Sequence, residues 1–510
     1  MKSIYFIAVC LFVIANAYAQ EPADALRYSW LTQSGTARNQ AIGGAGASLG
    51  GEFSSLFINP AGLGFYKTND FVLTPSYALK DYKSAYMSNN SKTNKVDFNL
   101  AASGFLFSSP SENKSVKSIT FAIGVNKAAD FSSHIYYKGQ NNASSYSEKY
   151  LEELVNNKVT DPNNAAMDYP YGSSLALNTY LIDTVQASDG SVSGYRSVAN
   201  PSFGLLQENT INTSGGITDI ALGAGVNLKE KWFFGGTITF PFLNYNRDGN
   251  YKETDLSGDS NNNFNYFESN ETLQTKGVGI NAKLGVIYKP VEYVRLGLAL
   301  HTPTFYQLTD KYNAEVITDL EGYGGAGTKH QSSVDVNGSQ LESKYDLVTP
   351  LKIMASASYV FREVEDVQRQ KAFITADVEY INYKGSSFSA VDNTDGSGAK
   401  EYYKSLNKTI DNLYKSAINV RLGGEVKFNT IMFRLGGAYY GNPYKNEKAD
   451  LVKVSGGLGY RNKGMFIDLT YIYSVNKDIH YPYLLQDKSN LPAYLKNKAG
   501  NIVATIGFKI

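Results

Sequence analysis

The stretch "NIVATIGFKI", residues 501–510, closes the chain and alternates strictly between two kinds of side chain. One set is apolar and comprises Ile502, Ala504, Ile506, Phe508 and Ile510. The set between them is mostly polar or small and comprises Val503, Thr505, Gly507 and Lys509. Because successive side chains of a β-strand point to opposite faces, this period predicts a strand with one apolar face. That face forms the core of a soluble sandwich, or it meets lipid in an outer-membrane barrel.

The same alternation recurs upstream, for example in "SITFAIGVN" (118–126) and "KAFITADVEYINY" (371–383). We identify fourteen candidate strands, each long enough to cross a bilayer, which takes about nine residues or more. They lie near residues 69–79, 95–107, 117–127, 210–228, 231–246, 271–289, 291–308, 341–361, 371–384, 411–428, 430–441, 449–461, 464–476 and 499–510.

The lengths of the connections distinguish a sandwich from a barrel. Tight turns at 228–231, 289–292, 428–430 and 461–464 alternate with long polar segments at 80–94, 128–209, 247–270, 309–340, 385–410 and 477–498. Among the connections on the side of the long segments, only 441–448 is short. Outer-membrane barrels have short turns on the periplasmic side and long loops on the external side. A sandwich does not require short and long connections to alternate along the chain. We therefore predict an all-β chain in which residues 69–510 form a 14-stranded antiparallel transmembrane β-barrel.

Composition and the first residues agree with an exported barrel. Residues 1–19 have a basic start at Lys2, a short apolar run and an Ala-Tyr-Ala end, which predicts a cleaved signal peptide. The only cysteine is Cys10, so the mature chain has no disulfide, and Val9 before it speaks against a lipoprotein signal. The net charge of +1 gives no strong positive electrostatic field that would attract nucleic acid. We expect a multi-pass protein of the outer membrane.

A glycine-rich stretch, "QAIGGAGASLGGEFSSLFINPAGLGFY" (40–66), lies between the cleavage site and the first strand. It is not a nucleotide loop, because Leu49 stands where a dinucleotide fingerprint needs glycine and no lysine follows as in a P-loop. A 14-stranded barrel is too wide for its own side chains to fill. We therefore predict that residues 20–68 form a hatch that plugs the lumen. Its apolar side chains are candidate walls of an apolar path: Phe53, Leu56, Phe57 and Phe65.

The long external loop 128–209 contains two predicted helices. In "SSYSEKYLEELVNN", Ser145 and Glu148 suggest a capping box, and apolar residues follow at helical spacing. "SSLALNTYLIDTV" shows the same spacing. Their apolar faces must pack on each other, on the barrel rim or on an apolar ligand, and rim packing is the commoner outcome. The candidate ligand-capture residues are Tyr150, Leu151, Leu154, Leu177 and Leu181.

No pattern of catalytic or metal-binding residues emerges. The four histidines are scattered and none is paired at the spacing of metal ligands: His134, His301, His330 and His480. A serine-hydrolase elbow is absent, and the segment 255–265 lacks the glutamate spacing of a calcium loop. The sequence predicts neither an enzyme nor a metal site, and it implies no cofactor.

The segment from Ala37 to Tyr66 resembles the N-terminal hatch of the FadL/TodX family of outer-membrane transporters for hydrophobic compounds. The family's hatch element corresponds to Asn59, Pro60 and Ala61 here. Weaker likenesses are "GVNKAADFSSHIYYKG" (124–139), "FPFLNY" (240–245) and "LHTPTFYQL" (300–308).

This resemblance implies passive transport of hydrophobic compounds such as long-chain fatty acids. In the family, the ligand collects at the outer loops, enters a barrel pocket and leaves sideways at an inward kink in the third strand. The alternation breaks at the matching place in this chain, so the candidate opening is Asn126, Ala128, Ala129, Asp130 and Phe131.

Two other functions stay open. Some related sequences are labelled haem receptors, and His330 and His480 on predicted external loops could ligate iron. Other barrels of this kind serve as non-transporting partners in protein secretion. The expected partners are outer-membrane lipid, a hydrophobic small molecule and, through the C-terminal strand, the barrel assembly machinery. Nucleic acid is not expected, and the barrel is expected to be a monomer.

Overall fold

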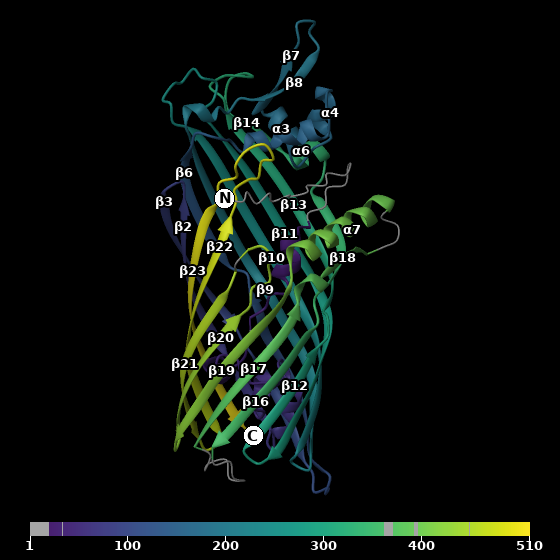
Figure 1. The fold of residues 1–510 in the computed structure, drawn as a ribbon, viewed down its shortest axis with the longest axis vertical. Helices are drawn as coiled ribbons and strands as arrows, with labels where there is room; N and C mark the ends of the chain where they lie inside the picture. The colour runs from purple at the N-terminus through teal and green to yellow at the C-terminus, as the bar shows by residue number, and fades with distance from the viewer. Residues whose placement is uncertain (1–19, 33, 362–370, 392–395, 448) are drawn as a thin grey trace.

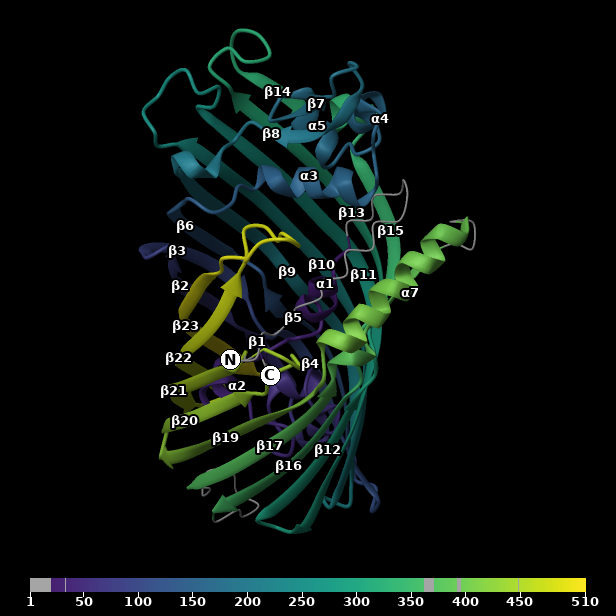
Figure 2. The same ribbon diagram turned by 45° about the horizontal axis from the view of Figure 1, so that its top comes forward.

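The chain folds as a tall barrel with its lower lumen filled by the N-terminal segment (Figures 1 and 2). The structure, a computed structural model, describes residues 20–32, 34–361, 371–391, 396–447 and 449–510. The predicted signal peptide, residues 1–19, lies outside the described residues.

Fourteen antiparallel passes form the wall, and the prediction of a closed 14-stranded barrel is confirmed. Several passes are interrupted and count as two strands each. The last strand pairs with both parts of the first pass and closes the barrel. In chain order the passes are β1–β2 (Asp70–Leu73, Pro75–Tyr86), β3–β4 (Asn89–Leu100, Ser103–Pro110), β5–β6 (Val116–Asp130, Ser133–Asn141), β9 (Leu205–Leu228), β10 (Trp232–Asp255), β11 (Tyr266–Val291), β12–β13 (Val294–His301, Phe305–Asp319), β15–β16 (Leu341–Val348, Lys352–Phe361), β17–β18 (Ala372–Asn382, Ser387–Ala390), β19 (Ser416–Phe428), β20 (Ile431–Tyr440), β21 (Leu451–Asn462), β22 (Met465–His480) and β23 (Ala493–Lys509).

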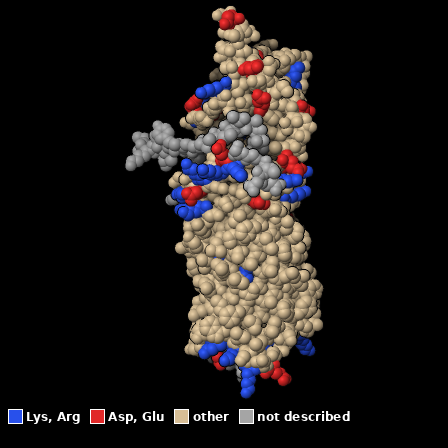
Figure 3. Space-filling view, turned by 90° about the vertical axis from the view of Figure 1, so that its right-hand side faces the viewer, with Lys and Arg blue, Asp and Glu red and all other residues tan. Residues whose placement is uncertain are grey.

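The outer face carries an apolar belt. Exposed Leu, Ile, Val and Phe side chains cover every pass, and charged groups gather above and below this belt (Figure 3). Exposed aromatic residues mark both margins, near the short turns with Trp232, Tyr293 and Phe428, and toward the long loops with Tyr77, Tyr439 and Tyr471. An apolar band flanked by aromatic girdles is what a barrel needs in a bilayer.

The strands extend farther toward the long loops than predicted. The second pass begins at Asn89, the third continues as β6 to Asn141, and β23 already begins at Ala493. The segment 128–209 is therefore not all loop, because its first part belongs to the wall. Above the membrane the strands carry polar side chains on both faces, as in "NRDGNYKETD" of β10 (246–255), so the alternation that reveals a strand disappears.

Helices and a hairpin fill the spaces that the strands leave. The hatch contains α1 (Pro22–Arg27), α2 (Ala37–Ala41), η1 (Phe53–Leu56) and η2 (Pro60–Phe65). The long loop holds three helices and a hairpin rather than two helices: α3 (Ser147–Asn156), α4 (Pro162–Met167), α5 (Ser173–Asn178), β7 (Ile182–Gln186), β8 (Val192–Ser197) and the turn η3 (Pro201–Phe203). Smaller elements are β14 (Lys329–Ser332), α6 (Ser333–Asn337) and η5 (Tyr383–Gly385).

The long polar connection 385–410 contains most of α7 (Gly396–Leu413), and the strand predicted from residue 411 begins only at Ser416. The apolar residues Tyr403, Leu406 and Ile410 of α7 recur at helical spacing and are buried. Among the described residues, no helix has the length and apolarity needed to cross a membrane.

Candidate functional site

The hatch lies against the barrel wall at backbone-to-backbone distance. Wall glycines face it at several contacts, and a Cβ at Gly235 would overlap the carbonyl of Pro60. A Cβ at Gly297 would lie 2.6 Å from the carbonyl oxygen of Ala47. Other wall glycines close to the hatch include Gly225, Gly285, Gly423 and Gly436. Glycine is needed here because any side chain would push the hatch away from the strands.

Asn59 is the polar anchor of the hatch. It is buried, its side-chain oxygen accepts the N–H of Ala61 at 3.2 Å, and its amide donates to the carbonyl oxygen of Ala47 at 2.6 Å. The same amide group lies 3.4 Å from the carbonyl oxygens of Val286 and Leu298 in the wall. Pro60 and Ala61 follow as the first turn of η2 and are also buried. The three residues therefore hold the hatch both to itself and to β11 and β12.

Replacing Asn59 with alanine is expected to destabilise the seated hatch by about 1–3 kcal/mol, because several buried partners lose their hydrogen bonds. Protease cleavage within residues 20–68 of the folded barrel measures this change. Asn94→Ala, at an exposed asparagine on the outer face of β3, is the control and should cleave like the parent. Equal cleavage of Asn59→Ala and the parent would contradict the anchoring role.

The predicted apolar path residues lie in close-packed contacts between hatch and wall. Phe53, Leu56 and Phe57 are buried in one cluster with wall residues that include Val72, Leu106 and Ala221. Phe65 stacks on Phe233 of β10, with ring centroids 3.8 Å apart. In this state they join the hatch to the strands, and a path along them requires the hatch to move.

Charged groups that the sequence analysis did not single out also fix the hatch. Buried Arg434 contacts Glu425 and Asp468, each at 2.6 Å, and Arg38 of the hatch reaches the same Glu425 at 3.3 Å. His301 lies 2.7 Å from the carbonyl oxygen of Ile58. Arg38 and Ile58 of the hatch are far in sequence from Glu425 and His301 of the wall, so only the folded barrel brings them together.

The first part of the hatch reaches an apolar cluster in the mid-lumen, which we call the central cluster. Ala25, Leu26 and Tyr28 of the hatch pack there with α7 and with side chains from several strands. The strand residues include Ile217, Leu243, Tyr245, Tyr306, Leu308 and Tyr345. Gln20, the first described residue, is fixed by hydrogen bonds from the hydroxyls of Tyr402 and Tyr403.

The wall is interrupted between the second and third passes. The β4–β5 ladder ends at the pair Ser103 and Val125. Above this pair, β5 and β6 stay paired with β9, with a bulge between Lys127 and Ala129. Among the strands that the structure describes, none pairs with β3 on the side facing β6. We call this boundary between β3 and β5–β6 the seam.

Side chains, not backbone ladders, close the seam. The ammonium of Lys80 lies 2.7 Å from the carboxylate of Asp130 and donates to the carbonyl oxygen of Ser132 at 2.7 Å. The hydroxyl of Tyr82 donates to the same carbonyl at 3.1 Å, and Thr93 donates to the backbone oxygen of His134. Such contacts can break one at a time, unlike a continuous ladder, so the seam can open without breaking a backbone ladder.

The predicted kink residues lie at this seam, and their inner side is apolar. Ala128, Ala129 and Phe131 pack on the central cluster. The ring of Phe131 lies 5.8 Å from that of Tyr28 and 5.6 Å from that of Tyr245. Asn126 contacts Ser34 of the hatch at 2.8 Å. One set of contacts thus joins the hatch, the central cluster and the seam.

The loop helices pack on the upper barrel. Tyr150, Leu154 and Leu181 are buried in a cluster with strand residues such as Phe267 and Val316, and Leu151 and Leu177 pack against it. Their apolar faces are thus covered by the rim.

The predicted capping box does not form in α3. The hydroxyl of Ser145 accepts the N–H of Ser147 at 3.1 Å, while Glu148 pairs with Lys488 at 2.7 Å. The carboxylate of Glu148 is drawn to a neighbouring loop and does not close the reciprocal bond.

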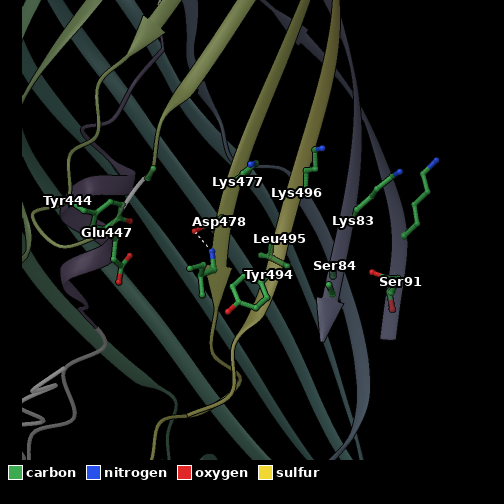
Figure 4. A pocket seen from close by; sticks show the side chains of 15 residues that line it. Lys83, Ser84, Ser91, Tyr444, Glu447, Lys477, Asp478, Tyr494, Leu495 and Lys496 are labelled. Atoms are coloured by element: carbon green, nitrogen blue, oxygen red, sulfur yellow. Dashed lines mark hydrogen bonds between the residues drawn. The ribbon is translucent and has the colours of Figure 1, made fainter. Parts of the chain in front are cut away.

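A cavity of about 730 Å³ opens at the mouth between β22, β23, β2 and the loop that follows β20 (Figure 4). Leu495 and Ser84 line its wall side, and Tyr444 and Glu447 line its loop side. Four lysines of the neighbouring strands also border it: Lys83, Lys92, Lys477 and Lys496. Burial, followed by the carboxylate of Asp478, raises the pKa of Glu447.

The histidines remain separate. The ring of His480 lies 2.7 Å from the hydroxyl of Tyr137, and His330 lies 3.6 Å from Glu315. His134 contacts Asn212 at the start of β6. The described residues contain no group of three or more His, Cys, Asp or Glu that could hold a metal ion.

Comparison with known proteins gives similarity in fold. No family model matches the chain, and no curated protein matches it by sequence. The fold resembles the crystal structure of a Pseudomonas aeruginosa FadL homologue, with a TM-score of 0.54 and 14% identity over 94% of this chain and 99% of that one. It also resembles the Ralstonia pickettii toluene transporter TbuX, with a TM-score of 0.50 and 14% identity over 94% and 99% of the two chains. The fold is therefore that of a FadL-like barrel.

Proposed function

We propose that this protein is a passive outer-membrane transporter of hydrophobic compounds, long-chain fatty acids or similar molecules, which leave the barrel sideways through the seam. The observation that carries the proposal is an unpaired stretch of wall whose inner side, Ala128, Ala129 and Phe131, adjoins an apolar cluster. The similar barrels described as a FadL homologue and a toluene transporter support this substrate class.

Physical chemistry favours the sideways route. The hatch fills the lower lumen with contacts that leave no room even for a Cβ at several wall positions. A solute passing straight through would displace this packing and then enter water. Burial of each methylene is worth about 0.8 kcal/mol, so a chain of roughly twelve methylenes gains about 10 kcal/mol by staying among apolar groups. On a route from the central cluster through the seam into lipid, the solute stays among apolar groups throughout. Transport along this route therefore needs no external energy source.

The proposal assigns a role to each part of the site. The mouth cavity receives the solute, the central cluster holds it, and the seam releases it. Asn59, Pro60 and Ala61 keep the hatch seated, so that small polar solutes do not leak. Residues 1–19 are proposed to direct export, and the apolar belt supports a location in the outer membrane.

Extraction of the barrel purified in mild detergent tests the substrate class. We expect mass spectrometry to find bound fatty acid or other apolar molecules, and we expect proteoliposomes to take up such molecules without an energy source. A barrel that carries no apolar molecule and swells liposomes in small sugars would contradict the proposal.

A haem titration separates the transport proposal from the haem alternative. The transport proposal predicts no Soret shift. A shift that is lost in His330→Ala/His480→Ala would instead identify a haem receptor. Stable complexes with exported proteins in the absence of solute flux would favour a secretion partner.

A further inference from the structure

A row of four lysines crosses the outer face of the barrel at one level. In register, Lys477 of β22 lies opposite Lys496 of β23, Lys496 opposite Lys83 of β2, and Lys83 opposite Lys92 of β3. Figure 4 shows Lys477, Lys496 and Lys83 on three neighbouring strands. All four are exposed, and their strand neighbours Ser84 and Leu495 are buried toward the lumen. Strand alternation therefore directs the four lysine side chains to the outer face, while the same four residues also border the mouth cavity at the upper edge of the wall. We call them the lysine row.

The arrangement is unfavourable without a counter-charge. Neighbouring strands lie about 4.8 Å apart, and like charges directly opposite each other destabilise a sheet. Lys498, one rung lower, adds a fifth positive charge beside Asp81. Asp81 lies 3.9 Å from Lys92. In the described part of the chain, no carboxylate lies within 4 Å of the ammonium groups of Lys83, Lys477 or Lys496. The surface is thus prepared for an anion from outside the protein.

The height of the row identifies the source of that anion. The last exposed apolar residue below it on β2 is Leu79, and the aromatic girdle on β22 ends at Tyr473. Each lies four residues below the row, which for a strand tilted by about 45° is a vertical distance of roughly 9 Å. This is the level of the lipid headgroups on the side of the long loops. One rung above, Tyr494 exposes 59% of its surface and offers a flat apolar face.

We propose that the lysine row binds the phosphate groups of an outer-leaflet glycolipid, with Tyr494 against its sugar. Four ammonium groups spread over about 14 Å match a headgroup carrying more than one phosphate, and each lysine near an anionic membrane surface contributes attraction. The row ends on β3, the strand that borders the seam. A glycolipid held there lies beside the opening through which the proposed function releases its solute. The binding site itself rests on the barrel's orientation and does not require that function.

The test measures binding of diphosphorylated lipid A to the detergent-purified full barrel. We expect Lys83→Gln/Lys92→Gln/Lys477→Gln/Lys496→Gln to weaken binding at least tenfold, and added salt to weaken binding to the parent. A matched variant removes four lysines at the opposite rim and should bind within twofold of the parent: Lys114→Gln, Lys231→Gln, Lys371→Gln and Lys463→Gln. If the fourfold variant does not fold, the end pair Lys92→Gln/Lys477→Gln replaces it, with an expected loss of at least threefold.

Two results would overturn the proposal. The first is equal binding of lipid A by the variant and the parent. The second is inorganic phosphate competing fully at concentrations equal to those of the lipid, which would indicate a simple anion site. The proposal is supported if binding weakens as phosphate groups are removed from lipid A. The binding measurement contains no transported solute, so it is independent of the proposed function. A variant that loses lipid A binding but keeps normal solute uptake would leave the proposed function intact. A barrel that binds lipid A but takes up no apolar solute would leave this site intact.

Discussion

A barrel whose seam is locked is expected to lose at least nine-tenths of its uptake of apolar solutes. Thr93 of β3 contacts the backbone of His134 on β6, so cysteines at both positions lie within reach of a short bis-methanethiosulfonate linker. The sequence from residue 20 onward contains no cysteine, so the linker reacts at these two sites alone. Locking acts because it prevents β3 and β6 from separating, while the paired wall below is untouched.

The control for the locked seam uses the same two passes below the interruption. Ser108 and Thr120 face each other in the β4–β5 ladder, and their hydroxyl groups are 3.0 Å apart. A Ser108→Cys/Thr120→Cys barrel treated with the linker should transport like the parent, because that part of the wall is already closed by backbone bonds. A reductant that removes the linker should restore uptake in the locked barrel. Full uptake by the locked barrel would exclude the seam as the exit.

Enlarging Gly235 is expected to open the lower lumen to water. In Gly235→Val the new side chain overlaps the carbonyl of Pro60, and overpacking of this kind costs about 1–3 kcal/mol. Because that cost falls on the contact between hatch and wall, the hatch should leave its seat. We expect flux of small sugars, measured by liposome swelling, to rise about tenfold.

Gly236→Val is the matched control for this variant. Gly236 is the next residue of β10, faces lipid, and would place a Cβ no closer than 3.7 Å to another side chain. Sugar flux through it should equal that of the parent. If Gly235→Val folds, as shown by its heat-dependent gel mobility, and remains as tight as the parent, then the hatch does not seal the barrel. If it does not fold, Gly235→Ala gives the same test with a smaller side chain.

The membrane-crossing part of the fold was predictable from residue order because lipid and lumen impose opposite demands on alternate side chains. "NIVATIGFKI" shows this in ten residues. The strand extensions above the membrane were not predictable in the same way, since both faces are polar in segments such as 246–255. Helix α7 did carry a signal in Tyr403, Leu406 and Ile410, but the surrounding lysines and asparagines made the segment resemble a loop.

The candidate site was predictable only where its signal is local. The break in alternation at Asn126–Phe131 marks the place where the β4–β5 ladder ends, and the Asn-Pro-Ala element marks the anchor of the hatch. Lys80 and Tyr82, which hold the seam closed, belong to another pass and look like ordinary strand residues. The lysine row likewise exists only through register, since Lys92 and Lys477 lie near opposite ends of the chain.

A sideways exit is distinguished from passage down the lumen by two fluxes, of an apolar solute and of a small sugar, measured in the same proteoliposomes for two variants. A sideways exit predicts that the locked seam removes at least nine-tenths of apolar uptake without changing sugar flux. It also predicts that Gly235→Val raises sugar flux and leaves apolar uptake within about twofold of the parent. Apolar uptake that survives the locked seam and rises together with sugar flux in Gly235→Val would show that the solute passes straight down the lumen, and would contradict a sideways exit.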